Sequence, residues 1–149
     1  MPTTPPDFRT VRQVSGQGIL ILGGGRALLM QVAHPLVARG VVEHSAYLED
    51  RVGRLLVTLR PIYAIAFGTP EEARAAALGV RRAHGPVAGA GYRASDPELM
   101  RWVLATLIDT SLLMHRRFVA PVDEATAEAY YREMCRLGEW IGLPEEAMP

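Results

Sequence analysis

The chain of 149 residues contains no lysine, so all 16 of its basic residues are arginine. This absence excludes Schiff-base chemistry on lysine, a P-loop nucleotide site and a lysine general base, because each needs that amine. Sixteen acidic residues balance the arginines, so no excess of positive charge favours a nucleic-acid partner. An arginine-only, alanine-rich composition is also typical of proteins encoded by GC-rich genomes.

Cysteine and long apolar runs are scarce as well. Cys135 is the only cysteine, which excludes an internal disulfide and a cysteine-based zinc cluster. Residues 1–13 lack the apolar core of a signal peptide. The longest apolar region, residues 99–114, is interrupted by Arg101 and Asp109 and is too short and polar to cross a bilayer. We therefore expect a cytoplasmic protein without a transmembrane segment.

Helical patterns dominate what is present. The clearest covers residues 69–84, "TPEEARAAALGVRRAH", where Thr69 can cap the helix, Pro70 suits its first position and Glu72 completes a capping box. Similar signals predict helices within 36–48, 50–68, 95–117 and 123–142, and Pro35 and Pro61 are expected to break or kink the chain.

No segment alternates with the period of two that indicates a strand. We predict a single all-α domain of about five to seven helices over residues 14–149, preceded by a flexible, proline-rich arm at residues 1–13. Residues 99–114 are apolar on nearly every side, so they are expected to form a buried central helix.

One stretch, "GILILGGGRALLMQ" at residues 18–31, is similar to the strand–glycine turn–helix of dinucleotide-binding folds. Gly23 and Gly25 occupy the first two glycine positions of that fingerprint, but Leu28 occupies the third, and no second strand follows. The interpretation we favour is a flexible entry into a helix that begins near Arg26.

Histidines offer a second possible site. No two of them have the i, i+4 spacing of a helical zinc site; they are His34, His44, His84 and His115. His84 lies late in the predicted helix 69–84, beside apolar residues. A histidine on an apolar helix face can present an axial nitrogen to haem, and it can equally be a packed core residue.

Arg54 and Thr58 are four residues apart, so they share one face of the helix predicted within 50–68. An arginine on an apolar face needs an anion, which can be a ligand group or a carboxylate of the chain. Asp109, which the pattern places inside the most apolar helix, and Glu43 are the candidate structural partners. From the residues alone, both interpretations stay open.

Three segments taken in order are distinctive: "GGGRALLMQVAHPLVARGVVEHS" at 23–45, "GRLLVTLRPIYAIAFGTPEEARAAALGVRRAHGPV" at 53–87 and "YRASDPELMRWVLATLIDTSLLMHRRF" at 92–118. Together they resemble the MpaB-type oxygenase family, which includes the latex-clearing proteins (rubber oxygenases) of actinobacteria. The resemblance covers about residues 8–145. It implies an all-α protein that holds haem b and uses dioxygen to cleave carbon–carbon double bonds of apolar, isoprenoid-like substrates.

The resemblance also implies site residues. The iron-ligating histidine of the family falls on His84. Its arginine–threonine pair near the haem falls on Arg54, which could hold a haem propionate or polarise dioxygen, and on Thr58, which could donate a hydrogen bond nearby. Val57 stands where rubber oxygenases have a lysine, and Glu43 is the candidate for their catalytic acid.

Two departures from the family bear on function. Leu104 stands where many relatives have a histidine, and relatives continue for further helices beyond the equivalent of Pro149. The haem pocket is therefore expected to be open, or to be completed by a partner chain or a homo-oligomer. The alternative function is a non-catalytic protein that only binds haem or another apolar ligand.

Overall fold

The computed structural model describes residues 7–44 and 51–149, except for the side chains of residues 51, 52, 54 and 55. This part of the chain forms seven α-helices: α1 (Arg9–Ser15), α2 (Gly24–Val32), α3 (Pro35–His44), α4 (Arg51–Phe67), α5 (Pro70–His84), α6 (Pro97–Phe118) and α7 (Glu124–Ile141). Two short 3₁₀ helices, η1 (Gly18–Gly23) and η3 (Glu145–Ala147), and a small antiparallel hairpin of β1 (Ala88–Gly89) and β2 (Tyr92–Arg93) complete it. The predicted all-α class is confirmed.

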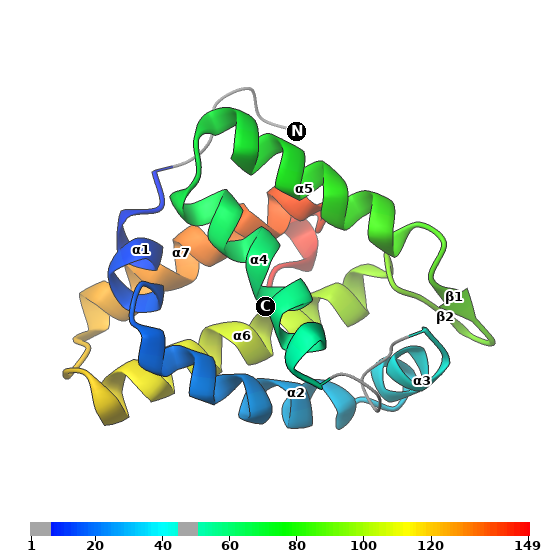
Figure 1. Cartoon of the computed structure of the whole chain (residues 1–149), viewed down its shortest axis with the longest axis horizontal. Helices are drawn as coiled ribbons and strands as arrows, with labels where there is room; N and C mark the ends of the chain where they lie inside the picture. Colours follow the sequence, from blue (N-terminus) through cyan, green and yellow to red (C-terminus); the bar gives the residue numbers. More distant parts are fainter. Residues whose placement is uncertain (1–6, 45–50) are drawn as a thin grey trace.

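Helix α6 is the central element. It packs against α1, α2 and α7 as well as both 3₁₀ helices, and Figure 1 shows it passing through the middle of the molecule. Leu104 and Ile108 on this helix are buried, whereas Arg101, Asp109 and Leu113 are exposed. The prediction of a central helix is confirmed, but one side of it faces solvent.

The predicted helix ends are confirmed at α5 and α7. Thr69 and Glu72 form the reciprocal capping box at the start of α5. Asp123 caps α7 by accepting a hydrogen bond from the Thr126 N–H, 2.7 Å from its carboxylate. Gly142 ends α7 with φ at 109°, a left-handed conformation that glycine adopts without steric cost.

The expected N-terminal arm is wrong for the residues that the structure describes. Phe8, Val11 and Val14 are buried in the core. Glu133 of α7 accepts hydrogen bonds from the backbone N–H groups of Thr10 and Val11, at 3.0 and 2.7 Å. A carboxylate from a distant helix therefore caps the first turn of α1, where backbone donors have no partner within the helix. Residues 1–6 of the predicted arm lie outside the described residues.

The glycine-rich stretch is helical, as the interpretation of a helix entry requires. Helix α2 begins at Gly24 rather than near Arg26, and the apolar residues before it form η1 instead of a strand. A Cβ on Gly23 would lie 2.7 Å from Cγ of Met114. This glycine therefore permits close packing against α6, a structural role with no need for a nucleotide.

The two prolines behave differently. Pro35 begins α3 after a sharp bend, so the break predicted there is confirmed. Pro61 lies inside α4, which continues on both sides of it, so the predicted break is absent there. Among the described residues, no single helix is long and apolar enough to cross a membrane. The segment Gly18–Val32 and helix α3 pass that test only together, across a bend of 112°.

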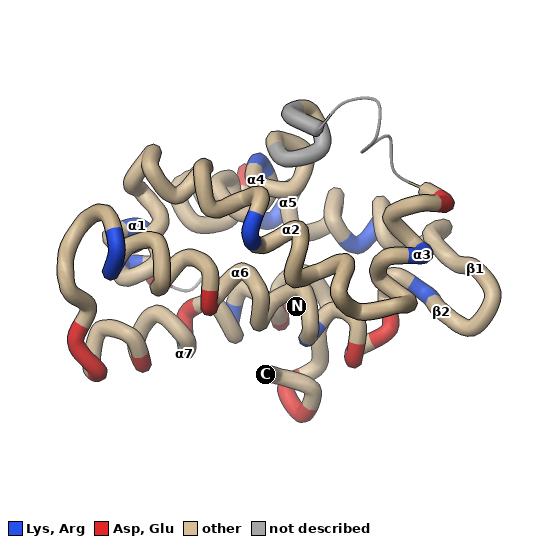
Figure 2. The backbone as a smooth tube through the Cα atoms, turned by 90° about the horizontal axis from the view of Figure 1, so that it is seen from below, with Lys and Arg blue, Asp and Glu red and all other residues tan. Residues whose placement is uncertain are grey.

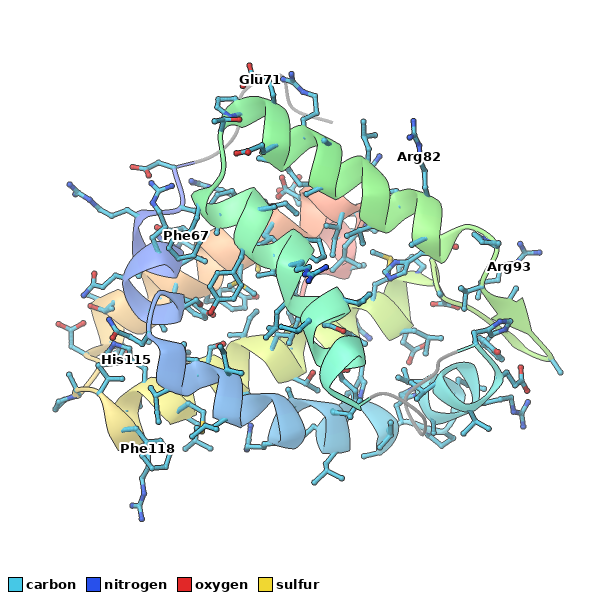
Figure 3. All side chains as sticks on the ribbon, viewed as in Figure 1. Phe67, Glu71, Arg82, Arg93, His115 and Phe118 are labelled. Atoms are coloured by element: carbon cyan, nitrogen blue, oxygen red, sulfur yellow. The ribbon has the colours of Figure 1, made fainter. Side chains whose placement is uncertain are left out.

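Charged residues of both signs are spread over the surface (Figure 2). Apolar side chains are exposed as well: Phe118 projects outward from the end of α6 (Figure 3) and is 58% exposed. Val42 of α3 is 75% exposed, Leu22 of η1 is 73% exposed and Leu29 of α2 is 70% exposed. Single exposed apolar residues are normal on protein surfaces, and these four come from different elements.

Candidate functional site

Helices α4 and α5 form an antiparallel pair around a tight turn at Gly68. A Cβ on Gly68 would lie 2.5 Å from the Ala64 carbonyl oxygen, so the turn requires glycine. Among the described helices, this pair makes the most extensive contact. Figure 1 shows that the two helices lie together at this turn and diverge toward their other ends.

The divergent ends of the pair carry the arginine and the histidine of the candidate site. Arg54 precedes Gly68 by 14 residues and His84 follows Thr69 by 15. Because the two helices rise equally per residue, the backbones of Arg54 and His84 lie at similar heights above the turn. The helix pair therefore places two positions that are 30 residues apart in sequence at similar distances from the turn.

Thr58 is half-buried on α4, one helical turn after Arg54. The side chain of Arg54 lies outside the described residues, so its role stays a prediction. Val57, at the position of the rubber-oxygenase lysine, is 63% exposed. In the described structure this side chain therefore faces outward, whereas the neighbouring Thr58 is partly enclosed.

His84 is the last residue of α5 and is half-buried. On the same side of the helix, one and two turns earlier, Val80 is half-buried and Ala77 is fully buried. The backbone N–H of Val87 donates to the His84 carbonyl at 3.2 Å and so begins the turn into the hairpin. The predicted apolar surroundings of His84 are thus present on its own helix.

Glu43 is the acceptor in a latch between α3 and the hairpin that follows α5. The Tyr92 hydroxyl donates to the Glu43 carboxylate at 2.6 Å, Arg39 donates to the Ala90 carbonyl at 2.8 Å, and an imidazole nitrogen of His44 lies 3.2 Å from the Ala88 carbonyl. The hydrogen bond to Glu43 is the main cause that raises the pKa of Tyr92, with burial second. Glu43 is thereby held near the end of α5 that carries His84.

The hairpin and this latch were not foreseen from the sequence. Gly91, with φ at 83°, supplies the left-handed residue of the turn, so the run "AGAGY" at 88–92 was the available signal. Gly89 and Gly40 both lie against the Tyr92 ring, where an added Cβ would come within 2.5 and 3.2 Å of ring atoms. These close approaches let Tyr92 sit between α3 and the hairpin.

Asp109, one of the two candidate structural partners of Arg54, is exposed and not buried as expected. Its pairing with Arg54 stays a prediction, because the Arg54 side chain lies outside the described residues. The side chain of Asp109 is 58% exposed, and it forms an ion pair of 2.7 Å with Arg26 of α2. Arg26 also donates to the Thr110 hydroxyl at 2.7 Å. Asp109 faces outward because the buried face of α6 is centred on Leu104 and Ile108. Apolar residues occur on nearly every side of this helix, so the sequence pattern did not show which side is buried.

Leu104, which replaces a histidine of many relatives, is 3% exposed. Its side chain packs on α7, where a Cβ on Gly138 would lie 2.9 Å from Cδ2 of Leu104. The leucine therefore contributes to the core between α6 and α7. The histidine that α6 does contain, His115, is buried near the end of the helix. Its Nδ1 atom lies 3.2 Å from the Ala120 carbonyl oxygen.

Two cavities of the described structure bear on the site. One of about 300 Å³ is bordered by residues of α6 and the C-terminal segment, together with His34. A smaller one of about 50 Å³ is bordered by Ser15, Tyr63 and Tyr130, among others, and the Tyr63 hydroxyl donates to the Ser15 carbonyl at 2.7 Å. Neither cavity is lined by Glu43, Thr58 or His84. No group of three or more metal-ligating side chains occurs among the residues described.

Comparison with known proteins decides the family. Residues 12–149 match the family described as "ER-bound oxygenase mpaB/B'/Rubber oxygenase, catalytic domain". The chain belongs to this oxygenase family. Two uncharacterized proteins, from Mycobacterium bovis and Mycobacterium tuberculosis, are each 32% identical to it over 131 residues.

Those 131 residues are 82% of this oxygenase-family chain and 51% of each mycobacterial relative. The chain thus spans about half the length of the curated relatives it matches. No solved structure matches the chain.

Proposed function

We propose that this chain is part of a haem b-dependent oxygenase that uses dioxygen to oxidise an apolar substrate, with cleavage of a C=C bond in an isoprenoid-like molecule as the specific reaction. Membership of the oxygenase family supports the reaction class. The observation that carries the proposal is the place of His84: a half-buried imidazole at the diverging end of the α4–α5 pair, at the height of Arg54.

The donor chemistry of this place fits haem. A porphyrin supplies four ligands to its iron, so the protein needs to add only an axial group such as imidazole. At the end of α5, His84 lies next to apolar helix surface, and no three-ligand cluster occurs among the described residues. This suits haem better than a metal ion bound by side chains alone. His84 is the residue that would hold the group.

Bound haem would supply the oxygen-activating redox chemistry. The residues of the chain would set its surroundings. His84 would bind through one imidazole nitrogen, and Arg54 would place a permanent positive charge beside a propionate, since guanidinium pairs well with carboxylate. Thr58 would offer a hydroxyl hydrogen bond one helical turn away. Apolar surface such as Val80 would exclude water and contact the hydrocarbon substrate.

A second candidate function is non-catalytic binding of haem or of another apolar ligand. It is favoured by Leu104, whose side chain belongs to the α6–α7 core and provides no polar group. It is also favoured by Val57, which provides no amine where rubber oxygenases have one. Under either function, a partner chain or a second copy of this chain would complete the haem pocket.

Haem stoichiometry together with oxygen uptake tests the proposal. We expect the purified chain, reconstituted with haem, to bind about one equivalent, and to consume dioxygen when a short polyisoprenoid is added. The variant His84→Ala should lose both properties, whereas His44→Ala, which alters an exposed histidine, should retain both. Haem binding without oxygen uptake would support the non-catalytic function. The absence of haem binding would contradict the oxygenase and would leave only the binding of another apolar ligand.

A further inference from the structure

The cavity of about 300 Å³ is separate from the residues discussed above and has a distinct chemistry. Its lining includes Glu98, Arg101, Trp102 and Ala105 of α6, His34 from the α2–α3 connection, and Met148. Glu98 and Arg101 are three residues apart, so they share one helix face. Trp102 and Ala105 continue that wall by one helical turn. The cavity thus combines two opposite charges with an apolar surface.

The two charged groups at the rim have no partner within the described part of the chain. Both side chains are exposed, and neither the carboxylate of Glu98 nor the guanidinium of Arg101 forms a hydrogen bond or ion pair with a described residue. By comparison, the carboxylates of Asp96 and Asp123 accept hydrogen bonds that cap helices. Glu98 and Arg101 are therefore available to a ligand.

His34 adds a polar group with unmet hydrogen-bonding capacity. Its Nδ1 atom is buried and has no hydrogen-bond partner among the described residues, a situation that ordinarily costs free energy. The ring lies against Trp102, with centroids 6.0 Å apart and planes at 50°. His34 lines the cavity, so its ring lies where it can meet a bound molecule.

Trp102 supplies the apolar wall. Its indole N–H is already used, because it donates to the carbonyl oxygens of Met30 and Gln31 at 3.1 and 3.2 Å. These bonds hold the ring against α2, and the ring lines the cavity. Ala105 and Met148 extend the surface, and a thioether beside an aromatic ring suits apolar or aromatic groups.

We propose that this cavity binds a small zwitterion with an apolar side chain, of the α-amino acid class. The ammonium group of the ligand would pair with Glu98, and the ligand carboxylate would pair with Arg101. The carboxylate would also accept a hydrogen bond from His34, directly or through a water molecule. The side chain would lie against Trp102. A singly charged ligand would leave one of the two opposite rim charges without a partner, so the two charges together favour the zwitterion.

Isothermal titration with three probes tests this site. The probes are L-phenylalanine, phenylacetate, which lacks the ammonium group, and phenethylamine, which lacks the carboxylate. We expect L-phenylalanine to bind roughly tenfold or more tightly than either analogue, as expected for the loss of one hydrogen bond to a charged group. O-Phosphoethanolamine, a zwitterion of the lipid-headgroup type, should bind more weakly because it lacks the apolar side chain.

Matched variants assign the charges. Arg101→Gln should remove the preference for L-phenylalanine over phenethylamine, and Glu98→Gln should remove its preference over phenylacetate. Arg116→Gln, at an exposed position near the other end of α6, should leave all three affinities unchanged. The indole N–H resonance of Trp102 should shift on binding, while that of Trp140, which is 0% exposed, should stay in place.

Several outcomes would overturn the site. Equal binding of the three small probes, absence of saturable binding, or equal effects of Arg101→Gln and Arg116→Gln would each show that the rim charges recognise no zwitterion. Tighter binding of O-phosphoethanolamine than of L-phenylalanine would instead identify a lipid headgroup as the ligand. The site does not depend on haem, so these results are independent of the proposed oxygenase function.

Discussion

At the scale of single residues, Gly23 shows how a conspicuous sequence feature serves packing. A Cβ added there would meet Cγ of Met114 at 2.7 Å and Cγ2 of Thr110 at 3.0 Å. We expect Gly23→Ala to lower the free energy of unfolding by about 1–3 kcal/mol, as overpacking does. Chemical denaturation measures this change.

Gly25 provides the matched control for Gly23. It lies two residues away, in the first turn of α2, and nothing lies within 4 Å of a Cβ built on it. Alanine is the better helix former, so Gly25→Ala should raise the free energy of unfolding by about 0.5–1 kcal/mol. Equal effects of the two substitutions would contradict the packing role of Gly23.

Glu133 is a second residue whose role depends on tertiary structure. Its buried carboxylate accepts two backbone hydrogen bonds from the first turn of α1. We expect Glu133→Ala to lower the free energy of unfolding by roughly 2 kcal/mol or more, because one buried and one part-buried N–H group lose a charged acceptor. Thermal unfolding followed by circular dichroism measures the loss.

The control for Glu133 is Glu128→Ala. Glu128 lies on the same helix and, among the residues the structure describes, pairs with the exposed Arg132 at 2.8 Å. Breaking such a surface pair should cost about 0.5 kcal/mol or less. If Glu133→Ala were as mild as Glu128→Ala, the cap on α1 would not contribute to stability.

These residues also show what sequence alone could reveal. The capping role of Thr69 was predictable because its partner, Glu72, is three residues away. The roles of Glu133 and Asp109 were not, because their partners, the start of α1 and Arg26, are far away in sequence. The position of a carboxylate in a helical pattern does not indicate which distant group it contacts in the folded protein.

At the scale of elements, the hairpin of β1 and β2 is held by α3 through Tyr92 and Glu43. We expect Tyr92→Phe to increase backbone hydrogen exchange in residues 88–93, because the hydrogen bond to Glu43 is lost. Tyr131→Phe, on the distant helix α7, should leave this exchange unchanged. An unchanged rate in Tyr92→Phe would contradict the latch.

The latch also predicts a response to alkaline pH. The pKa of Tyr92 is raised in the folded protein above its ordinary value of 10.0, chiefly by the hydrogen bond to Glu43. The stabilisation is therefore complete below about pH 10 and is lost as the pH rises through the folded pKa. Tyr92→Phe should show less alkaline destabilisation than the natural chain as the pH rises above about 10.

Most of the elements could be predicted from sequence, and the reasons are local. Helices α5, α6 and α7 begin at side-chain caps and carry long apolar patterns. Helix α1 has seven residues and is stabilised by burial of Phe8 and Val11. It was not predicted, because the beginning of the chain is polar and rich in proline. The hairpin has two residues in each strand, too few for any alternating pattern.

At the scale of the whole molecule, the candidate oxygenase site depends on how two long helices diverge. The family resemblance singled out Arg54, Thr58 and His84, and the fold brings Arg54 and His84 to similar heights on α4 and α5. The family itself is established. Haem, its ligand and the substrate stay predictions, since none of them follows from helix geometry.

The absorption spectrum after reconstitution with haem tests the central claim most directly. The account predicts a Soret band typical of imidazole-bound haem for the natural chain and for His44→Ala. It predicts no such band for His84→Ala, with recovery when free imidazole is added to that variant. An unchanged Soret band in His84→Ala, or its absence from the natural chain, would contradict the assignment of His84 as the axial ligand.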